Sequence, residues 1–162
     1  MKLSDVKASS GTVILATNNP PVSGQMAWIN DVHIGSENGE DIIHVIASTD
    51  LFNQKYTLLK FDSEGKLLLH RPIAFRERIL PRRLYANPFN PEEFIIGTNG
   101  GLFVSRPGNE YPIPDLSIPP VRITDLEYDK ENNKIIAIQG NGKKGYVQHI
   151  DLDGNGRLGT GG

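Results

Sequence analysis

The chain has 162 residues, of which 38% are hydrophobic, and this is enough for one ordinary domain with a packed core. Its formal net charge is −2, so no overall positive field attracts nucleic acid or an anionic membrane surface. The absence of cysteine excludes disulfides, thiolate metal sites and cysteine nucleophiles, and no apolar stretch approaches the ~18–20 residues of a membrane span.

Short apolar runs, each bounded by Gly, Asn, Asp or Pro, follow one another along the chain and predict an all-β protein. The segment Ile73–Arg83 is the one that can accommodate a short helical turn, before Pro81. In chain order, the expected strands are Thr12–Thr17, Ala27–Ile34, Ile42–Ser48, Tyr56–Asp62, Lys66–Arg71, Arg83–Ala86, Phe94–Thr98, Leu102–Ser105, Ile123–Tyr128, Lys134–Gln139, Tyr146–Asp151 and Arg157–Leu158.

Three segments of the sequence repeat one order of strands and turns. Each has an opening strand, an acidic or Asn-rich turn, a very apolar strand (IIHVIAS, FIIGTN, IIAIQG), a small-residue turn and a third strand. The first and third segments then turn through DSEGKL and DLDGNGRL into a fourth strand. A spacing of roughly 40–50 residues between units of four short antiparallel strands is typical of β-propeller blades.

The repeat divides the chain into an N-terminal extension with one strand, residues 1–24, and a three-blade segment, residues 25–162. The blades are expected at about 25–72, 82–117 and 120–162. Propellers close with at least about four blades. Three blades therefore predict an incomplete propeller. It is part of a longer chain, or two copies close a six-bladed ring, or another subunit completes it, and a fragment or subunit completed by other protein is favoured.

The second repeat also resembles a known family. The stretch YANPFNPEEFIIGTNGGLFVS, Tyr85–Ser105, is similar to blades of the sortilin-like, xyloglucanase-like and sialidase-type propellers that carry the bacterial neuraminidase repeat. This resemblance implies the propeller fold. The family's Ser-x-Asp-x-Gly motif is broken here, because Pro107 stands where Asp belongs after Ser105, so the resemblance does not extend to sialidase activity.

The C-terminal stretch DLDGNGRLGTGG matches the first half of a calcium loop. Asp151, Asp153 and Asn155 occupy alternate positions, as the oxygen ligands of Ca²⁺ do. Gly162 stands where the loop requires a bidentate Glu, and FDSEGKL occupies the same place in the first repeat. A hairpin turn without a cofactor is therefore the favoured interpretation, and a calcium site is the alternative.

Two carboxylates recur at equivalent positions of the repeat, Asp31 in WINDV and Asp125 in RITDL. In propellers that cleave sugars, paired carboxylates serve as acid and base, which makes these two residues the catalytic candidates. The alternative is that each Asp binds backbone N–H groups near the centre of the fold, and this structural role is favoured.

Several further residues are candidates for binding. Arginine side chains bind carboxylates with two parallel hydrogen bonds, so an Arg-rich segment predicts contact with an anion or an acidic partner. Aromatic rings stack on sugars, and on this ground two aromatic residues are candidates for binding a glycan. The residues are Arg76, Arg78, Arg82 and Arg83 for the first role, and Trp28 and Tyr111 for the second.

The sequence as a whole favours a non-enzymatic propeller segment that serves as an interaction or structural module, in an exported or cell-surface assembly. It predicts no nucleic-acid partner and no membrane span. The alternative from another class is a fragment of a glycan-active or glycan-binding propeller.

Overall fold

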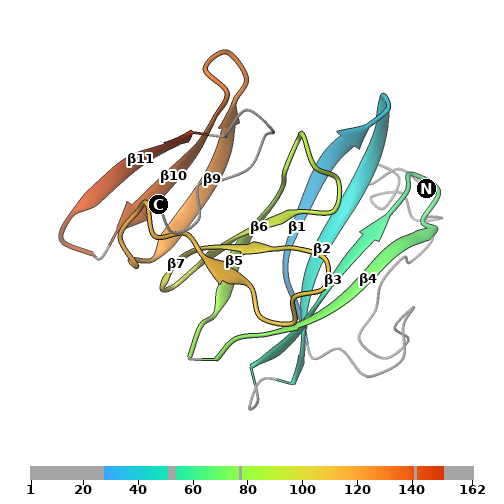
Figure 1. Ribbon diagram of the computed structural model, residues 1–162, viewed down its shortest axis with the longest axis horizontal. Coiled ribbons are helices and arrows are strands. Elements are labelled where there is room, and N and C mark those ends of the chain that lie inside the picture. Colours follow the sequence, from blue (N-terminus) through green and yellow to red (C-terminus); the bar gives the residue numbers. More distant parts are fainter. Residues whose placement is uncertain (1–27, 51–53, 77, 141, 152–162) are drawn as a thin grey trace, which may run out of the picture.

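The computed structural model describes residues 28–50, 54–76, 78–140 and 142–151, and in these residues all regular structure is β (Figure 1). The predicted all-β class is confirmed. The strands are β1 (Trp28–Glu37), β2 (Glu40–Asp50), β3 (Lys55–Phe61), β4 (Leu67–Ala74), β5 (Pro81–Ala86), β6 (Phe94–Thr98), β7 (Gly101–Ser105), β8 (Ile113–Pro114), β9 (Ile123–Asp129), β10 (Lys134–Gly140) and β11 (Gly145–Asp151).

Every strand expected among these residues is present, and the expected strands Thr12–Thr17 and Arg157–Leu158 lie outside them. Strand β8 was not expected from the sequence. It is two residues long and lies between Pro112 and Asp115, so it has no apolar run that would reveal it. It is a strand because it pairs with β7.

The helical turn expected within Ile73–Arg83 is wrong. Residues 73–74 end β4, residues 81–83 begin β5, and the described residues between them are bends and coil. Their backbone N–H groups donate to other segments, Phe75 to the Gln54 carbonyl and Leu80 to Asn99 Oδ1. A helical turn would need these groups for its own hydrogen bonds.

The strands form three antiparallel sheets, β1–β4, β5–β8 and β9–β11, each with its strands in chain order. We call them the first, second and third sheets. Figure 1 shows the second sheet, in green and yellow, between the first sheet, in blue to green, and the third, in orange and red. The opening strands of the three sheets meet, because β5 contacts both β1 and β9. We call β1, β5 and β9 the inner strands.

Each inner strand carries a β-bulge near its start. The register skips Asn30 in β1, Arg82 in β5 and Thr124 in β9. A bulge of this kind adds one residue to one strand and bends it locally. When the three strands are aligned on their bulges, the residues that follow are equivalent: Asp31, Arg83 and Asp125, and after them Val32, Leu84 and Leu126.

The core consists of apolar side chains packed between neighbouring sheets. One cluster joins the first and second sheets through Ile46, Leu58, Leu84, Phe94 and Ile96, among others. Another joins the second and third sheets and is built mainly of aliphatic side chains, among them Ile95, Leu102, Ile123, Leu126 and Ile135. A third cluster lies within the first sheet, on the alternate residues Ile43, Val45, Ala47, Leu59 and Phe61. The sheets are therefore held together face to face, with the inner strands along one side.

Candidate functional site

Two adjoining hollows run along the inner strands, and His33 and Tyr85 line both of them. The smaller hollow has a volume of about 280 Å³ and the larger one about 640 Å³. Residues from all three sheets border each hollow, so this is the place where the sheets converge. We take the two hollows as the candidate functional site.

The equivalent residues Asp31, Arg83 and Asp125 all border the smaller hollow. Oδ2 of Asp31 accepts a hydrogen bond of 2.8 Å from the backbone N–H of Leu84, on the next inner strand. Arg83 Nε lies 3.5 Å from Asp125 Oδ1, again on the next inner strand. Each inner strand is therefore linked to its neighbour by a side chain from the same position.

The predicted pair of carboxylates is thus brought to one hollow, with Arg83 as a third member. Asp125 Oδ1 also accepts a hydrogen bond of 2.9 Å from the backbone N–H of Leu126. A general acid or base must exchange a proton with the substrate. Here each carboxylate accepts a hydrogen bond from a backbone N–H group, as expected if the two residues stabilise the backbone of the inner strands. A catalytic role for Asp31 and Asp125 stays a prediction.

The larger hollow contains a stack of rings. His33 and His44 are register partners on β1 and β2, and their ring centroids are 5.9 Å apart. On its other side His33 packs against Tyr85 at 4.1 Å, while His44 meets the edge of Phe94 at 5.6 Å. Burial lowers the pKa of His33, against the opposing effect of Asp31. Burial, with Glu127 acting in the same direction, raises the pKa of Tyr85.

His44 is the most deeply buried titratable group of this hollow. Its exposed fraction is 2%, and its ring nitrogens make no hydrogen bond of good geometry with the described residues, although the backbone of His33 and Ile42 lies near enough to oppose the lowering of its pKa. Burial lowers its pKa to about 4, and the nearby His33 and Lys60 act in the same direction. The ring fits because position 35 is glycine, where a Cβ would lie 3.1 Å from His44 Cε1. His44 is therefore neutral at neutral pH.

Sequence reasoning treated the histidines as separate. The signal that pairs His33 with His44 is the Asn38-Gly39 turn, in which both residues have positive φ. Asn-Gly favours a two-residue hairpin, and such a hairpin fixes the cross-strand register. Once this turn is recognised, position 33 falls opposite position 44.

The buried Lys60 binds two residues that line the larger hollow, Glu37 and Pro91. The Nζ of Lys60 on β3 donates to Glu37 Oε1 and to the Pro91 carbonyl, each at 2.6 Å. Glu37 ends β1 in the first sheet, whereas Pro91 precedes β6 in the second. Lys60 thus connects two sheets, which the sequence, where it appears as an isolated Lys in an apolar run, did not reveal.

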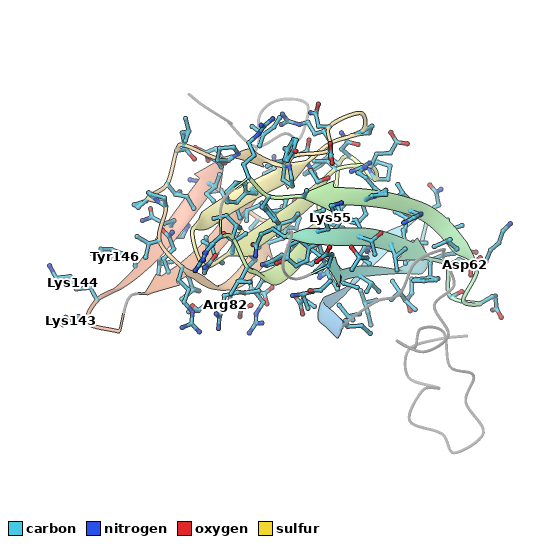
Figure 2. The ribbon with its side chains drawn as sticks, turned by 90° about the horizontal axis from the view of Figure 1, so that it is seen from below. Lys55, Asp62, Arg82, Lys143, Lys144 and Tyr146 are labelled. Atoms are coloured by element: carbon cyan, nitrogen blue, oxygen red, sulfur yellow. The ribbon has the colours of Figure 1, made fainter. Side chains whose placement is uncertain are left out.

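The structure does not gather the four candidate arginines into one binding site. The guanidinium of Arg76 lies over the ring of Tyr111 at 3.9 Å, so these two predicted binding residues pack on each other. Arg78 is exposed, and Arg82 is the bulge residue of β5, which Figure 2 shows at the periphery of the molecule. Only Arg83 reaches the hollows.

The remaining predicted residues lie at strand ends or outside the description. Trp28 begins β1 and pairs in register with Ser48. Asp151 ends β11, with its exposed carboxylate 3.3 Å from Lys134 Nζ. Asp153 and Asn155, the other two expected calcium ligands, lie outside the described residues.

Within the described part of the chain, no group of three or more His, Asp or Glu side chains is placed to hold a metal ion. The same residues include no helix long and apolar enough to cross a membrane. The sequence matches no protein-family model and no curated protein.

Proposed function

We propose that the chain is a non-enzymatic segment of a β-propeller and that it acts by binding another protein chain through the open face of its third sheet. The observation that carries the proposal is the exposure of two apolar residues, Ile138 and Val147, at positions that are buried between sheets elsewhere in the same chain.

The propeller arrangement is supported by three features. The sheets follow one another with their inner strands in contact, each inner strand has its bulge at the same place, and apolar clusters fill both spaces between neighbouring sheets. The sequence of the second repeat resembles propeller blades independently of these features. A propeller is built in this way, from repeated antiparallel sheets around a central channel.

The open face is identified by comparing equivalent residues. In the first sheet, Asp31 pairs with Ile46 and Ile46 pairs with Leu58. In the second sheet, the same positions are Arg83, Gly97 and Leu102. In the third sheet, they are Asp125, Ile138 and Val147.

Ile46, Leu58 and Leu102 are at most 1% exposed, because the next sheet covers them, whereas Ile138 is 37% exposed and Val147 59%. We call Ile138 and Val147 the acceptor face. Side chains that the fold places as core become interface when the covering sheet comes from another chain.

The proposal is tested by photo-cross-linking in cells that produce the chain. Val147 is replaced by p-benzoylphenylalanine, and the matched control carries the same residue at Leu116, which is 71% exposed on the second sheet's loop. We expect covalent protein adducts at position 147 in excess of those at position 116. Equal labelling at the two positions, or no adduct at 147, contradicts the proposal.

A glycan-active propeller fragment is the second candidate, and one observation favours it: Asp31 and Asp125 border the same hollow. It is tested with fluorogenic glycosides and the variants Asp31→Asn and Asp125→Asn. Hydrolysis that both substitutions abolish would support this candidate. Under the interaction proposal, we expect no hydrolysis above the buffer rate by the unaltered chain.

A further inference from the structure

We infer that the acceptor face takes a basic strand of a different protein. In this strand an aliphatic residue packs on Ile138 and Val147, and the residue directly after it is a Lys or Arg that pairs with Glu127. The inference rests on the proposed function and names the chemistry of its partner. It is carried by a difference in charge between the inner strand of the open sheet and the inner strands of the two covered sheets.

The two internal junctions show what a covering strand contributes. Leu84 of β5 packs in one cluster with Ile46 and Leu58 of the first sheet, which occupy the positions equivalent to the acceptor face. Leu126 of β9 packs in the same manner with Leu102 of the second sheet. At both junctions, the space is filled by an aliphatic residue that comes second after the bulge of the covering inner strand. The acceptor face therefore requires an aliphatic residue from its partner.

The residue after this aliphatic residue also has a fixed neighbour. Tyr85 follows Leu84, and its ring lies 4.1 Å from that of His33 on the inner strand of the covered sheet. Glu127 follows Leu126 and borders the smaller hollow together with Tyr85, whose pKa is raised by burial and by the nearby Glu127. Each covering strand thus places this residue beside the inner strand that it covers.

Glu127 is the residue of the open sheet that corresponds to His33 and Tyr85. It lies two residues after Asp125, as they lie two residues after Asp31 and Arg83, so it is on the same side of its sheet as the acceptor face. His33 and Tyr85 are uncharged at neutral pH, because burial lowers the pKa of the first and raises that of the second. Only the open sheet has an acidic side chain at this position.

The described residues leave Glu127 without a partner. Its side chain is exposed and makes no hydrogen bond or ion pair with them. Asp125 lies near Arg83, and Asp129 accepts hydrogen bonds from the N–H groups of its own turn. Covering an acidic group without supplying a partner is unfavourable, whereas a Lys or Arg beside it provides a charge-assisted hydrogen bond. The partner's residue next to Glu127 is therefore basic.

A second copy of this chain does not meet these requirements. Its β1 has Val32 followed by His33, which is neutral rather than basic. The apolar residues of its first sheet are also at most 4% exposed and so are not open for docking: Ile43, Val45, Ala47, Leu59 and Phe61. The partner is therefore a different protein.

The test uses the chain with p-benzoylphenylalanine at position 147, irradiated in cells that produce it. Three further versions carry Glu127→Gln, Glu127→Lys or the matched control Glu40→Lys, which is exposed at the start of β2. We expect severalfold fewer protein adducts with Glu127→Gln, fewer still with Glu127→Lys, and no change with Glu40→Lys. Circular dichroism of the purified variants checks that all three fold, as expected for changes at exposed positions.

Mass spectrometry of the adducts then locates the cross-linked segment of the partner. We expect it to contain an aliphatic residue followed directly by Lys or Arg. Replacing that basic residue of the partner by Glu should restore the adducts of Glu127→Lys, because the two charges are then exchanged.

Three results overturn the inference. They are adduct yields that neither Glu127 variant lowers, cross-linked segments without such a basic residue, and adducts of twice the 17.9 kDa mass of one chain, which contain two copies of it. In each of these cases, labelling at position 147 in excess of position 116 leaves the proposed function standing. If position 147 yields no adduct at all, both fail.

Discussion

At the scale of single residues, the junction of the first two sheets contains two buried ionisable side chains, His44 and Lys60. His44 is neutral there, and the Nζ of Lys60 donates to two oxygen atoms. Burial makes protonation of the histidine unfavourable. For the lysine, burial makes the loss of a hydrogen-bond partner destabilising.

We expect His44 to make the protein less stable as the pH falls. The folded-state pKa is about 4 and the ordinary value is 6.5, so between these values the unfolded chain binds the proton and the folded chain does not. The free energy of unfolding therefore falls as the pH drops from 6.5 towards 4 and stops falling below 4. A shift of this size corresponds to at most about 3 kcal/mol.

Urea unfolding at pH 7, 5.5 and 4.5 measures this dependence. His44→Gln removes the titrating ring and is expected to flatten the profile, whereas His149→Gln, at an exposed position, is expected to leave it unchanged. The groups that face His44 are His33, Lys60 and Phe94, and the pKa of His33 is lowered as well. If the free energy of unfolding of His44→Gln still falls as steeply with pH, then other groups cause the dependence.

Lys60→Met is expected to destabilise the fold by about 1–3 kcal/mol, because Glu37 and the Pro91 carbonyl lose their donor in a half-buried place. The matched control is Lys134→Met, which breaks the exposed pair with Asp151 and should cost under about 1 kcal/mol. Both values come from denaturant unfolding at pH 7. Equal losses in the two variants would show that the bonds of Lys60 contribute no more than a surface pair.

At the scale of elements, the second and third sheets approach each other over a glycine. A Cβ on Gly97 in β6 would lie 2.6 Å from Ile123 Cγ2 and 3.3 Å from Leu126 Cδ1. The equivalent residues in the other second strands are Ile46 and Ile138. The spacing of the sheets near their inner strands is therefore set by a different side chain at each junction.

Gly97→Ala should cost about 1–3 kcal/mol, since the added methyl group forces the two sheets apart. Gly140→Ala in β10 is the control, because its nearest neighbour would be the Lys144 carbonyl oxygen at 3.6 Å, an ordinary contact. Thermal unfolding of both variants, and of Gly97→Ala with Ile123→Ala, checks the cause. The second change should recover part of the loss, and a double variant with fully additive losses would refute the steric explanation.

The elements also show how far the sequence alone could be interpreted. The strands follow from short apolar runs, and the equivalence of Asp31 with Asp125 follows from the repeat. The sequence did not group Arg83 with these two residues because the second repeat has a positive charge where the other two have Asp. In addition, the position of a β-bulge cannot be recognised from the periodicity of apolar residues. His44 and Lys60 were missed because both lie in runs that resemble ordinary buried strands. Their partners come from sequence positions that only the packing of sheets brings close.

At the scale of the whole molecule, one position of the third strands is covered by a neighbouring sheet in two of the sheets and exposed in the third sheet. Leu58, Leu102 and Val147 are equivalent, but a neighbouring sheet covers only the first two. Figure 2 shows the hairpin of β10 and β11, marked by Lys143, Lys144 and Tyr146, at the end of the molecule opposite to Asp62 in the first sheet. The open position thus belongs to the last of the three sheets that the described residues form.

The same truncation should therefore have different costs at the three positions. Leu58→Ala and Leu102→Ala are expected to lower the free energy of unfolding by about 2–5 kcal/mol, as in closed cores. Val147→Ala is expected to change it by under about 0.5 kcal/mol in dilute solution, because Val147 is 59% exposed. A large loss for Val147→Ala under those conditions would mean that its position is already covered within a single chain.

The two junctions between sheets differ in chemistry, and this has a consequence for the order in which the molecule comes apart. The first junction holds His33, His44 and Lys60, whereas the cluster at the second is built of aliphatic residues with Tyr85 and Tyr128 at its edge. Between pH 6.5 and about 4, His44 gains a proton when the first junction opens but not while it is closed, and the aliphatic cluster of the second junction has no such group. Mild acid should therefore release the first sheet while the second and third remain joined, so that disassembly has a direction along the chain.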